Sequence, residues 1–259
     1  MELPIYQVDA FTGRLFGGNP AAVVLLKEWL PDETMQAIAG ENNLAETAFV
    51  LTGGSDFGLR WFSPSIEVDL CGHATLASAH VLYHHGLART SPIVFRYKAG
   101  TLSVARDGDL LAMDFPARPP EPAAADPALA VALGSKPREV QRSRDLVAVF
   151  DTQEAVEALQ PDFAALNRLD TFAVAVTAPG RECDFVSRFF APRAGVPEDP
   201  ATGSSHCTLV PYWSRRLGKK GLHAVQVSRR RGEFFCEDKG ERVTIAGRAV
   251  EYLRGQITV

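Results

Sequence analysis

The segment RWFSP, at residues 60–64, returns later in the chain as RFFAP, at residues 188–192. A polar turn follows each copy, DLCGHA at residues 69–74 and EDPATGSSH at residues 198–206. Each copy runs from a strand-like segment through its turn into a helix-like stretch, which predicts two equivalent halves. Helix N-termini carry unpaired N–H groups and a partial positive charge. Two of them facing one site would suit a small anion or carboxylate.

The composition is that of an ordinary globular protein, with 46% hydrophobic and 22% charged residues in a chain of 259. A net charge of −4 argues against a general nucleic-acid binder. The basic run at residues 228–231 is followed at once by an acidic segment, so it predicts a turn between strands. No apolar stretch is long enough to predict a membrane span.

Four scattered cysteines without CxxC spacing, and an N-terminus without a basic and then apolar signal, predict a reduced cytoplasmic protein. The Pro- and Ala-rich segment at residues 117–126 is the clearest change in composition and predicts a linker. The expected division is therefore 1–116, 117–126 and 127–259, with the final strand able to pair back onto the first half.

The apolar pattern predicts α+β halves, each with several strands around one mostly buried helix. The expected central helices span residues 73–85 and 203–217, and Pro211 lies inside the second. A further helix is expected to begin at Pro31 and end near Gly40, with Asp32 as its N-cap. The main expected strands are residues 5–11, 21–26, 46–51, 57–62, 93–97, 101–106, 110–115, 146–150, 171–177, 184–189, 224–228, 233–236, 242–246 and 256–259.

The two polar turns hold most of the candidate site residues. Gly72 and Gly203 occupy matching positions, where the lack of a Cβ lets a ligand approach the backbone. Asp199, Thr202 and Ser204 lie around Gly203 in the second copy and carry polar side chains that a ligand could contact. The alternative is that these three are ordinary caps and turn residues. Two matched copies in one chain favour the functional interpretation.

Histidines supply two further hypotheses. His73 lies beside a helix N-terminus, whose dipole disfavours the protonated ring, so a neutral imidazole is expected to make one hydrogen bond there. A capping role is the alternative. His80 and His84 are four residues apart and could share a metal ion, but no third ligand lies at a recognisable spacing. No metal site is therefore expected.

Glu46 places a carboxylate at the start of an apolar strand. Partial desolvation would raise its pKa into the range that is useful for proton transfer. On residue patterns alone, an exposed glutamate at a strand start is the favoured interpretation.

Four ordered motifs change that balance, GGNPAAV at 17–23, NLAETAF at 43–49, DLCGHAT at 69–75 and EDPATGSSHC at 198–207. Together they closely resemble the phenazine-biosynthesis isomerase family, the PhzF-like proteins. The resemblance implies the diaminopimelate epimerase-like fold, in which two α+β halves each wrap a curved sheet around a central helix, with the site between them. It also implies a homodimer.

The same resemblance implies the residue roles. Glu46 matches the family's acid/base, and His73, Asp199 and Ser204 match its polar site residues. In PhzF enzymes the glutamate is thought to move a proton within a dihydro-hydroxyanthranilate ring, while helix-end amides hold the carboxylate. Asn19 sits where epimerase relatives carry a substrate-contacting asparagine, although Asn before Pro is also a common turn.

The epimerases of this fold use two thiols, one on each face of a carbon. Here the first position keeps Cys71, but the second holds Thr202, whose hydroxyl is too weakly acidic to act as a base. The leading hypothesis is thus a cofactor-independent isomerase of a small carboxylic acid. An epimerase or racemase, and a non-catalytic small-acid binder, remain alternatives. No nearby Cys–His–acid arrangement is visible around Cys71, so it is expected to be a small buried residue.

Overall fold

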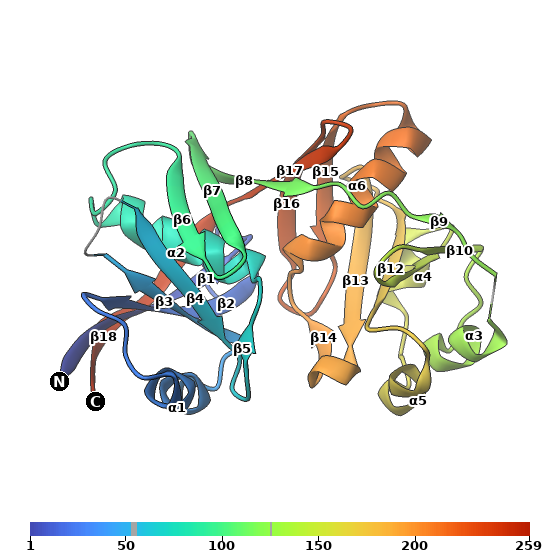
Figure 1. Cartoon of the computed structure of the whole chain (residues 1–259). Helices are drawn as coiled ribbons and strands as arrows, with labels where there is room; N and C mark the ends of the chain where they lie inside the picture. The colour runs from blue at the N-terminus through green and yellow to red at the C-terminus, as the bar shows by residue number, and fades with distance from the viewer. Residues whose placement is uncertain (53–55, 125) are drawn as a thin grey trace. The chain divides into compact units, whose positions relative to one another are not determined.

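The computed structural model describes residues 1–52, 56–124 and 126–259 (Figure 1). The chain forms two compact units, the first made of Met1–Asp114 with Ala246–Val259 and the second of Phe115–Ile245. The chain therefore passes between units at residues 114–115 and 245–246. Residues 117–126, of which residue 125 lies outside the described ranges, fall within the second unit rather than between the two.

The first unit is a mixed sheet with helix α2 (Gly72–His84) packed on it. The strands are β1 (Glu2–Ala10), β2 (Asn19–Leu26), β3 (Glu46–Leu51), β4 (Phe57–Phe62), β5 (Glu67–Val68), β6 (Ile93–Tyr97), β7 (Gly100–Asp107), β8 (Leu110–Pro116) and β18 (Ala249–Thr258). The β2–β3 and β4–β6 pairs are parallel, whereas β1 pairs antiparallel with both β2 and β18. The last strand thus returns to the first unit, and it begins at Ala249 rather than at residue 256 as expected.

Helix α2 is buried around most of its circumference, as its apolar pattern predicts. It packs against β1, β2, β3 and β18. Its two buried hydroxyl residues do not leave polar atoms unpaired, because Thr75 donates to the Cys71 carbonyl at 2.6 Å and Ser78 to the Ala74 carbonyl at 2.7 Å. The helix can therefore lie in the core without an unsatisfied hydroxyl.

The second unit has the same arrangement, with strands around helix α6 (Gly203–Leu217). Its strands are β9 (Glu121–Pro122), β10 (Glu139–Arg142), β11 (Leu146–Val149), β12 (Val174–Pro179), β13 (Phe185–Ala191), β14 (Val196–Asp199), β15 (Gly221–Gln226), β16 (Gly232–Asp238) and β17 (Arg242–Gly247). Its other helices are α3 (Pro127–Leu133), α4 (Gln153–Glu157), α5 (Phe163–Arg168) and the 3₁₀ turn η1 (Pro192–Ala194).

The two units match strand by strand. The run β2–β3–β4–β6–β7 alternates parallel and antiparallel pairs in the order parallel, antiparallel, parallel, antiparallel. The run β11–β12–β13–β15–β16 has the same order. Short strands β5 and β14 pair with β4 and β13 respectively, just before α2 and α6 begin. The predicted α+β class and the duplication are thus confirmed.

Local predictions fared unevenly. The basic run at residues 228–231 does join two strands, β15 and β16. Helix α1 (Asp32–Asn42) is present, but the cap assignment was wrong: Pro31 is its N-cap, and Asp32 instead accepts a hydrogen bond from Arg60 Nη1 at 2.8 Å. Pro31 can precede the helix because a missing N–H there costs no helical hydrogen bond.

Gly18 makes the turn between β1 and β2, and we expect its replacement by Ala to be costly. Its φ is +55°, and a Cβ would lie 2.0 Å from the Ala10 carbonyl oxygen. Gly18→Ala should therefore lower the free energy of unfolding by about 2–5 kcal/mol, from the left-handed backbone and the clash together. Urea denaturation measures the loss. Gly195→Ala is the control, because Gly195 has φ +77° with open space around it and should lose only about 1–2 kcal/mol. Equal losses would show that the clash is relieved.

Candidate active site

Asn19, Glu46, Cys71 and His73 lie at the starts of three elements of the first unit, β2, β3 and α2. Asn19 is the first residue of β2, Glu46 the first of β3, and His73 the second of α2. Because β2 and β3 are parallel, with Ala21 opposite Glu46, their starting ends lie side by side. The N-cap of α2 is Cys71, which brings its thiol to the same point.

Short contacts join these groups around the imidazole ring. His73 Nε2 lies 3.2 Å from Glu46 Oε2, and His73 Nδ1 lies 3.4 Å from Cys71 Sγ. The Asn19 amide nitrogen is 3.3 Å from His73 Nδ1. Asn19 and His73 are buried, whereas the Glu46 side chain keeps 20% of its surface exposed. The carboxylate is thus the member of the group that a substrate can reach.

The Asn19 amide can serve either protonation state of the ring. With the amide nitrogen towards Nδ1 it donates to a neutral imidazole, and turned by half a rotation its oxygen accepts from a protonated one. The Asn19 amide can therefore hydrogen-bond the ring in either protonation state.

The pKa of Glu46 moves opposite to the expected direction. Burial raises the pKa of this carboxyl, as the sequence predicts, but the charge and hydrogen bond of His73, together with Cys71, outweigh burial and hold it below its ordinary value. The prediction of a raised pKa was wrong because the partner lies outside the local sequence. Glu46 is a carboxylate at neutral pH.

The prediction of a neutral His73 was also wrong. Burial lowers the pKa of the ring, but interactions with Cys71 and Glu46 raise it well above its ordinary value. Burial and the Glu46 charge raise the pKa of the Cys71 thiol, so this sulfur keeps its proton near neutral pH. His73 and Glu46 therefore face each other, with Nε2 and Oε2 3.2 Å apart, beside a protonated thiol.

Cys71 is buried, as expected, but a Cys–His–acid group does exist around it. Among residues 1–52, 56–124 and 126–259, Glu46, Cys71 and His73 make up the one group of three potential metal ligands, with ligand atoms within 4.8 Å of one another. His80 and His84 belong to no such group in those ranges; their rings stack with centroids 5.4 Å apart. Burial lowers the pKa of His80 to about 4, so that ring is neutral.

The second unit places its candidate residues on the turn between β14 and α6. Asp199 ends β14, Thr202 is the N-cap of α6, and Gly203 and Ser204 are its first two residues. Thr202, Gly203 and Ser204 match Cys71, Gly72 and His73 at the start of α2. The sequence alignment of the two turns is thus reproduced by the fold.

Thr202 does not act as an ordinary capping side chain. Its hydroxyl makes no cap hydrogen bond to α6 and donates instead to Asp199 Oδ2. Ser205 donates to the Thr202 carbonyl at 2.9 Å, within the turn itself. The capping alternative for Thr202 is therefore not what the structure shows, and its hydroxyl holds the Asp199 carboxylate.

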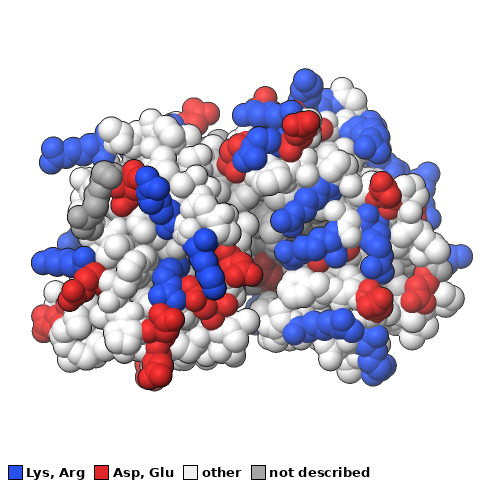
Figure 2. All heavy atoms as spheres, in the orientation of Figure 1, with Lys and Arg blue, Asp and Glu red and all other residues white. Residues whose placement is uncertain are grey.

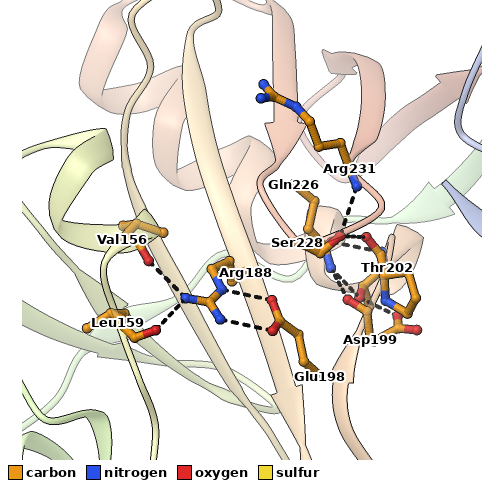
Figure 3. Close-up of polar contacts among 10 residues, drawn as sticks. Val156, Leu159, Arg188, Glu198, Asp199, Thr202, Gln226, Ser228 and Arg231 are labelled. Carbon is orange, nitrogen blue, oxygen red and sulfur yellow. Dashed lines mark hydrogen bonds and ion pairs between the residues drawn. The ribbon is translucent and has the colours of Figure 1, made fainter. Parts of the chain in front are cut away.

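Gln226, at the end of β15, is a site residue that sequence reasoning missed (Figure 3). Gln226 is fully buried, and its side-chain amide forms two hydrogen bonds to the backbone of the turn, which we call the Gln226 clamp. Its side-chain oxygen accepts from the Thr202 N–H at 2.8 Å, and its nitrogen donates to the Asp199 carbonyl at 2.5 Å. Ser228 adds a hydrogen bond to the Pro200 carbonyl at 2.6 Å. A glutamine ending an apolar strand was the only sequence signal for this clamp.

Replacing Gln226 by Leu should loosen this turn. The change keeps an aliphatic side chain but leaves the buried Thr202 N–H without its acceptor, which we expect to cost about 1–3 kcal/mol of unfolding free energy. Urea denaturation followed by circular dichroism measures it. The exposed Gln160 provides the control, since Gln160→Leu should stay within about 0.5 kcal/mol of the parent. A Gln226→Leu protein as stable as the parent would contradict the clamp.

The structure thus brings together Asn19, Glu46, Cys71 and His73 in one unit, and Asp199, Thr202 and Gln226 in the other. That the two groups share one site stays a prediction.

On the face drawn in Figure 2, acidic and basic side chains are interspersed over the first unit. No helix within the described ranges has the length and apolar character needed to cross a bilayer.

The family is decided by a match to the model of phenazine biosynthesis-like proteins over residues 8–255. The chain belongs to this family. A curated relative, an uncharacterized isomerase of Pseudomonas aeruginosa, is 54% identical over 258 residues, covering 99% of each chain. A human phenazine biosynthesis-like domain-containing protein is 39% identical and is matched over the full length of both chains.

Solved structures of this family and of an epimerase have the same fold. A PhzF-family protein of Enterococcus faecalis superposes with a TM-score of 0.98 at 45% identity, covering 100% of both chains. A hydroxyproline epimerase of Agrobacterium vitis has a TM-score of 0.61 at 13% identity, covering 99% of this chain and 92% of the other. The phenazine biosynthesis-like family and these epimerases thus share the fold that the sequence motifs imply.

Proposed function

We propose that this protein is a cofactor-independent isomerase that moves a proton within a small carboxylic acid. The observation that carries the proposal is the Glu46–His73 ion pair, with the carboxylate partly exposed and the imidazolium buried behind it. The name "isomerase" of the Pseudomonas aeruginosa relative supports the reaction class. Glu46 is ready to accept a proton at neutral pH, and His73 is ready to give one.

The proposed reaction begins when Glu46 takes a proton from an activated C–H bond of the substrate. The electron pair of that bond moves into the adjoining unsaturated system, and a proton is delivered to another carbon of the same molecule. Protonated Glu46 can return the proton itself, and His73 stabilises its carboxylate before and after. Isomerisation then needs one base on one face of the substrate.

Carboxylate binding is assigned to the helix N-termini of both units. The proposed carboxylate contacts are the N–H group at Gly72 in the first unit and, in the second, the N–H group at Gly203 with the Ser204 hydroxyl; Asp199 would orient a polar group of the substrate. Neither helix has a side-chain cap hydrogen bond.

An epimerase of the same fold is the second candidate. Cys71 is present as the first thiol, but Thr202 occupies the matching N-cap and its hydroxyl is held by Asp199. A threonine hydroxyl is a far weaker acid than a thiol, so the second base of a two-thiol mechanism is missing. Loss of optical rotation from an L-amino acid would reverse this preference.

The proposal is tested by proton exchange with solvent. The protein is incubated in D₂O, with a chelator and without added cofactor, with a series of small carboxylic acids that carry an activated C–H bond, beginning with dihydro-hydroxyanthranilate. Loss of a C–H signal by proton NMR, or a shifted double bond, is the expected result. Saturable binding of these acids without any exchange would instead support a non-catalytic binding protein.

A further inference from the structure

Arg188, on β13, is largely buried, and all three nitrogens of its guanidinium donate hydrogen bonds (Figure 3). Its Nε and one terminal nitrogen form a bidentate pair with Glu198, at 2.8 and 2.9 Å. Its other terminal nitrogen donates to the carbonyls of Val156 and Leu159, at 3.2 and 2.9 Å. The guanidinium lies over the Phe190 ring, 5.0 Å from its centroid, and the side chain is 11% exposed.

The partner, Glu198, directly precedes the candidate site residue Asp199 on β14. Neighbouring side chains on a strand point to opposite faces. Glu198 accordingly reaches back to Arg188, while Asp199 reaches forward to the Thr202 hydroxyl. Arg188 and Asp199 are thus linked through Glu198, the residue next to Asp199.

The first unit contains the same device. Arg60, on β4, binds Glu67 with the same two nitrogens, at 2.7 and 2.8 Å, and lies over Phe62 at 5.2 Å. Glu67 and Glu198 each stand five positions before the first helical residue, Gly72 or Gly203. The arginine and aromatic residues of the repeated segment thus serve to anchor the strand that leads into each polar turn.

The two copies differ in how firmly the arginine is held. The remaining nitrogen of Arg60 binds the largely exposed Asp32, whereas that of Arg188 binds two main-chain carbonyls. Main-chain acceptors are fixed by the fold, and Arg188 is the less exposed of the two arginines. The second copy is therefore the better candidate for a positioning role.

We propose that Arg188 is a positioning residue that acts through Glu198 to orient Asp199. The proposal rests on the proposed function, in which Asp199 contacts the substrate. A planar fork with five donors is needed to grip a carboxylate with two nitrogens and still reach two carbonyls, which lysine cannot do. Arg188→Lys keeps the charge and removes the fork, so it isolates the geometry.

The first experiment needs no substrate. Amide hydrogen exchange, followed by mass spectrometry, should be faster in residues 196–205 of the Arg188→Lys protein than in the parent, and unchanged in residues 209–217 of α6. The control is Arg138→Lys, since Arg138 forms an exposed ion pair with Asp151 and should alter neither segment. Unchanged exchange in residues 196–205 would overturn the proposal whatever the protein's activity.

The second experiment is a double-mutant cycle on the best acid from the exchange screen. Arg188→Lys should lower kcat about 10-fold, with a smaller change in KM, because a displaced polar group weakens transition-state contacts. Added to Asp199→Asn, it should have no further effect, since its target is already altered. If Asp199→Asn turns over too slowly to be measured, the kinetics of Arg188→Lys alone test the proposal: a lower kcat with a smaller change in KM supports it.

The outcomes separate the two proposals. An Arg188→Lys effect that adds in full to that of Asp199→Asn, or a normal kcat in Arg188→Lys, would show a merely structural arginine. Asp199→Asn turnover equal to the parent would instead remove Asp199 from the proposed function. In that case faster amide exchange in residues 196–205 would still show that Arg188 anchors the turn.

Discussion

Replacing Glu46 by Gln is expected to remove substrate-dependent deuterium exchange, lowering its rate about 10²–10⁴-fold. The amide keeps the size of the side chain and can still hydrogen-bond His73, but it cannot accept a proton from carbon. Binding of the carboxylic acid should persist, because the proposed carboxylate contacts come from helix amides. Exchange is followed by proton NMR, and binding by isothermal titration calorimetry on the same acid.

The matched control is Glu41→Gln, a change of the same chemistry at an exposed position near the end of α1. It should leave both exchange and binding unchanged. Exchange that survives Glu46→Gln at the parent rate would remove Glu46 as the base, and with it the proposed mechanism. Loss of binding along with exchange would assign Glu46 to substrate recognition instead.

His73→Asn should lower exchange about 10²-fold and also move its pH dependence. In the parent, His73 holds the pKa of Glu46 below its ordinary value against the opposing effect of burial. Without the imidazolium, burial remains and the Glu46 pKa rises. The carboxylate then becomes protonated at higher pH, so the acid limb of the rate profile should shift to higher pH.

This shift is measured as the pH dependence of kcat/KM for exchange in the two proteins. His84→Asn serves as the control, because His84 is an exposed residue of the same helix. It should leave the acid limb in place. An acid limb that stays in place or moves to lower pH in His73→Asn would show that His73 does not set the Glu46 pKa.

The central helices could be predicted from sequence with good accuracy. Helix α6 spans Gly203–Leu217, as expected, and α2 differs by one residue at each end. Helix α2 has apolar residues on nearly every face, and α6 ends directly before Gly218, its C-cap, so local patterns were sufficient to find both. The Asp32 cap failed for a long-range reason, since Arg60 attracts that carboxylate away from the helix.

The candidate residues of each unit lie in contact with one another, but their charge states differ from those expected from the sequence. Asn19, Glu46 and His73 do meet, and Thr202 and Asp199 do interact. The charge states of Glu46 and His73 were predicted wrongly, because each was judged from its own neighbours in the sequence. The Gln226 clamp could not be anticipated, because a single glutamine at a strand end has no distinctive pattern.

The sequence by itself determined that the chain has two equivalent halves, and that each half carries polar residues at the start of a buried helix. Those features depend on residues close together in the chain, whose spacing can be seen directly. Only the tertiary structure decided that the pKa of Glu46 is lowered, that the pKa of His73 is raised and that Arg188 holds Glu198. These depend on distances between atoms from separate strands and helices, which the folded chain alone sets.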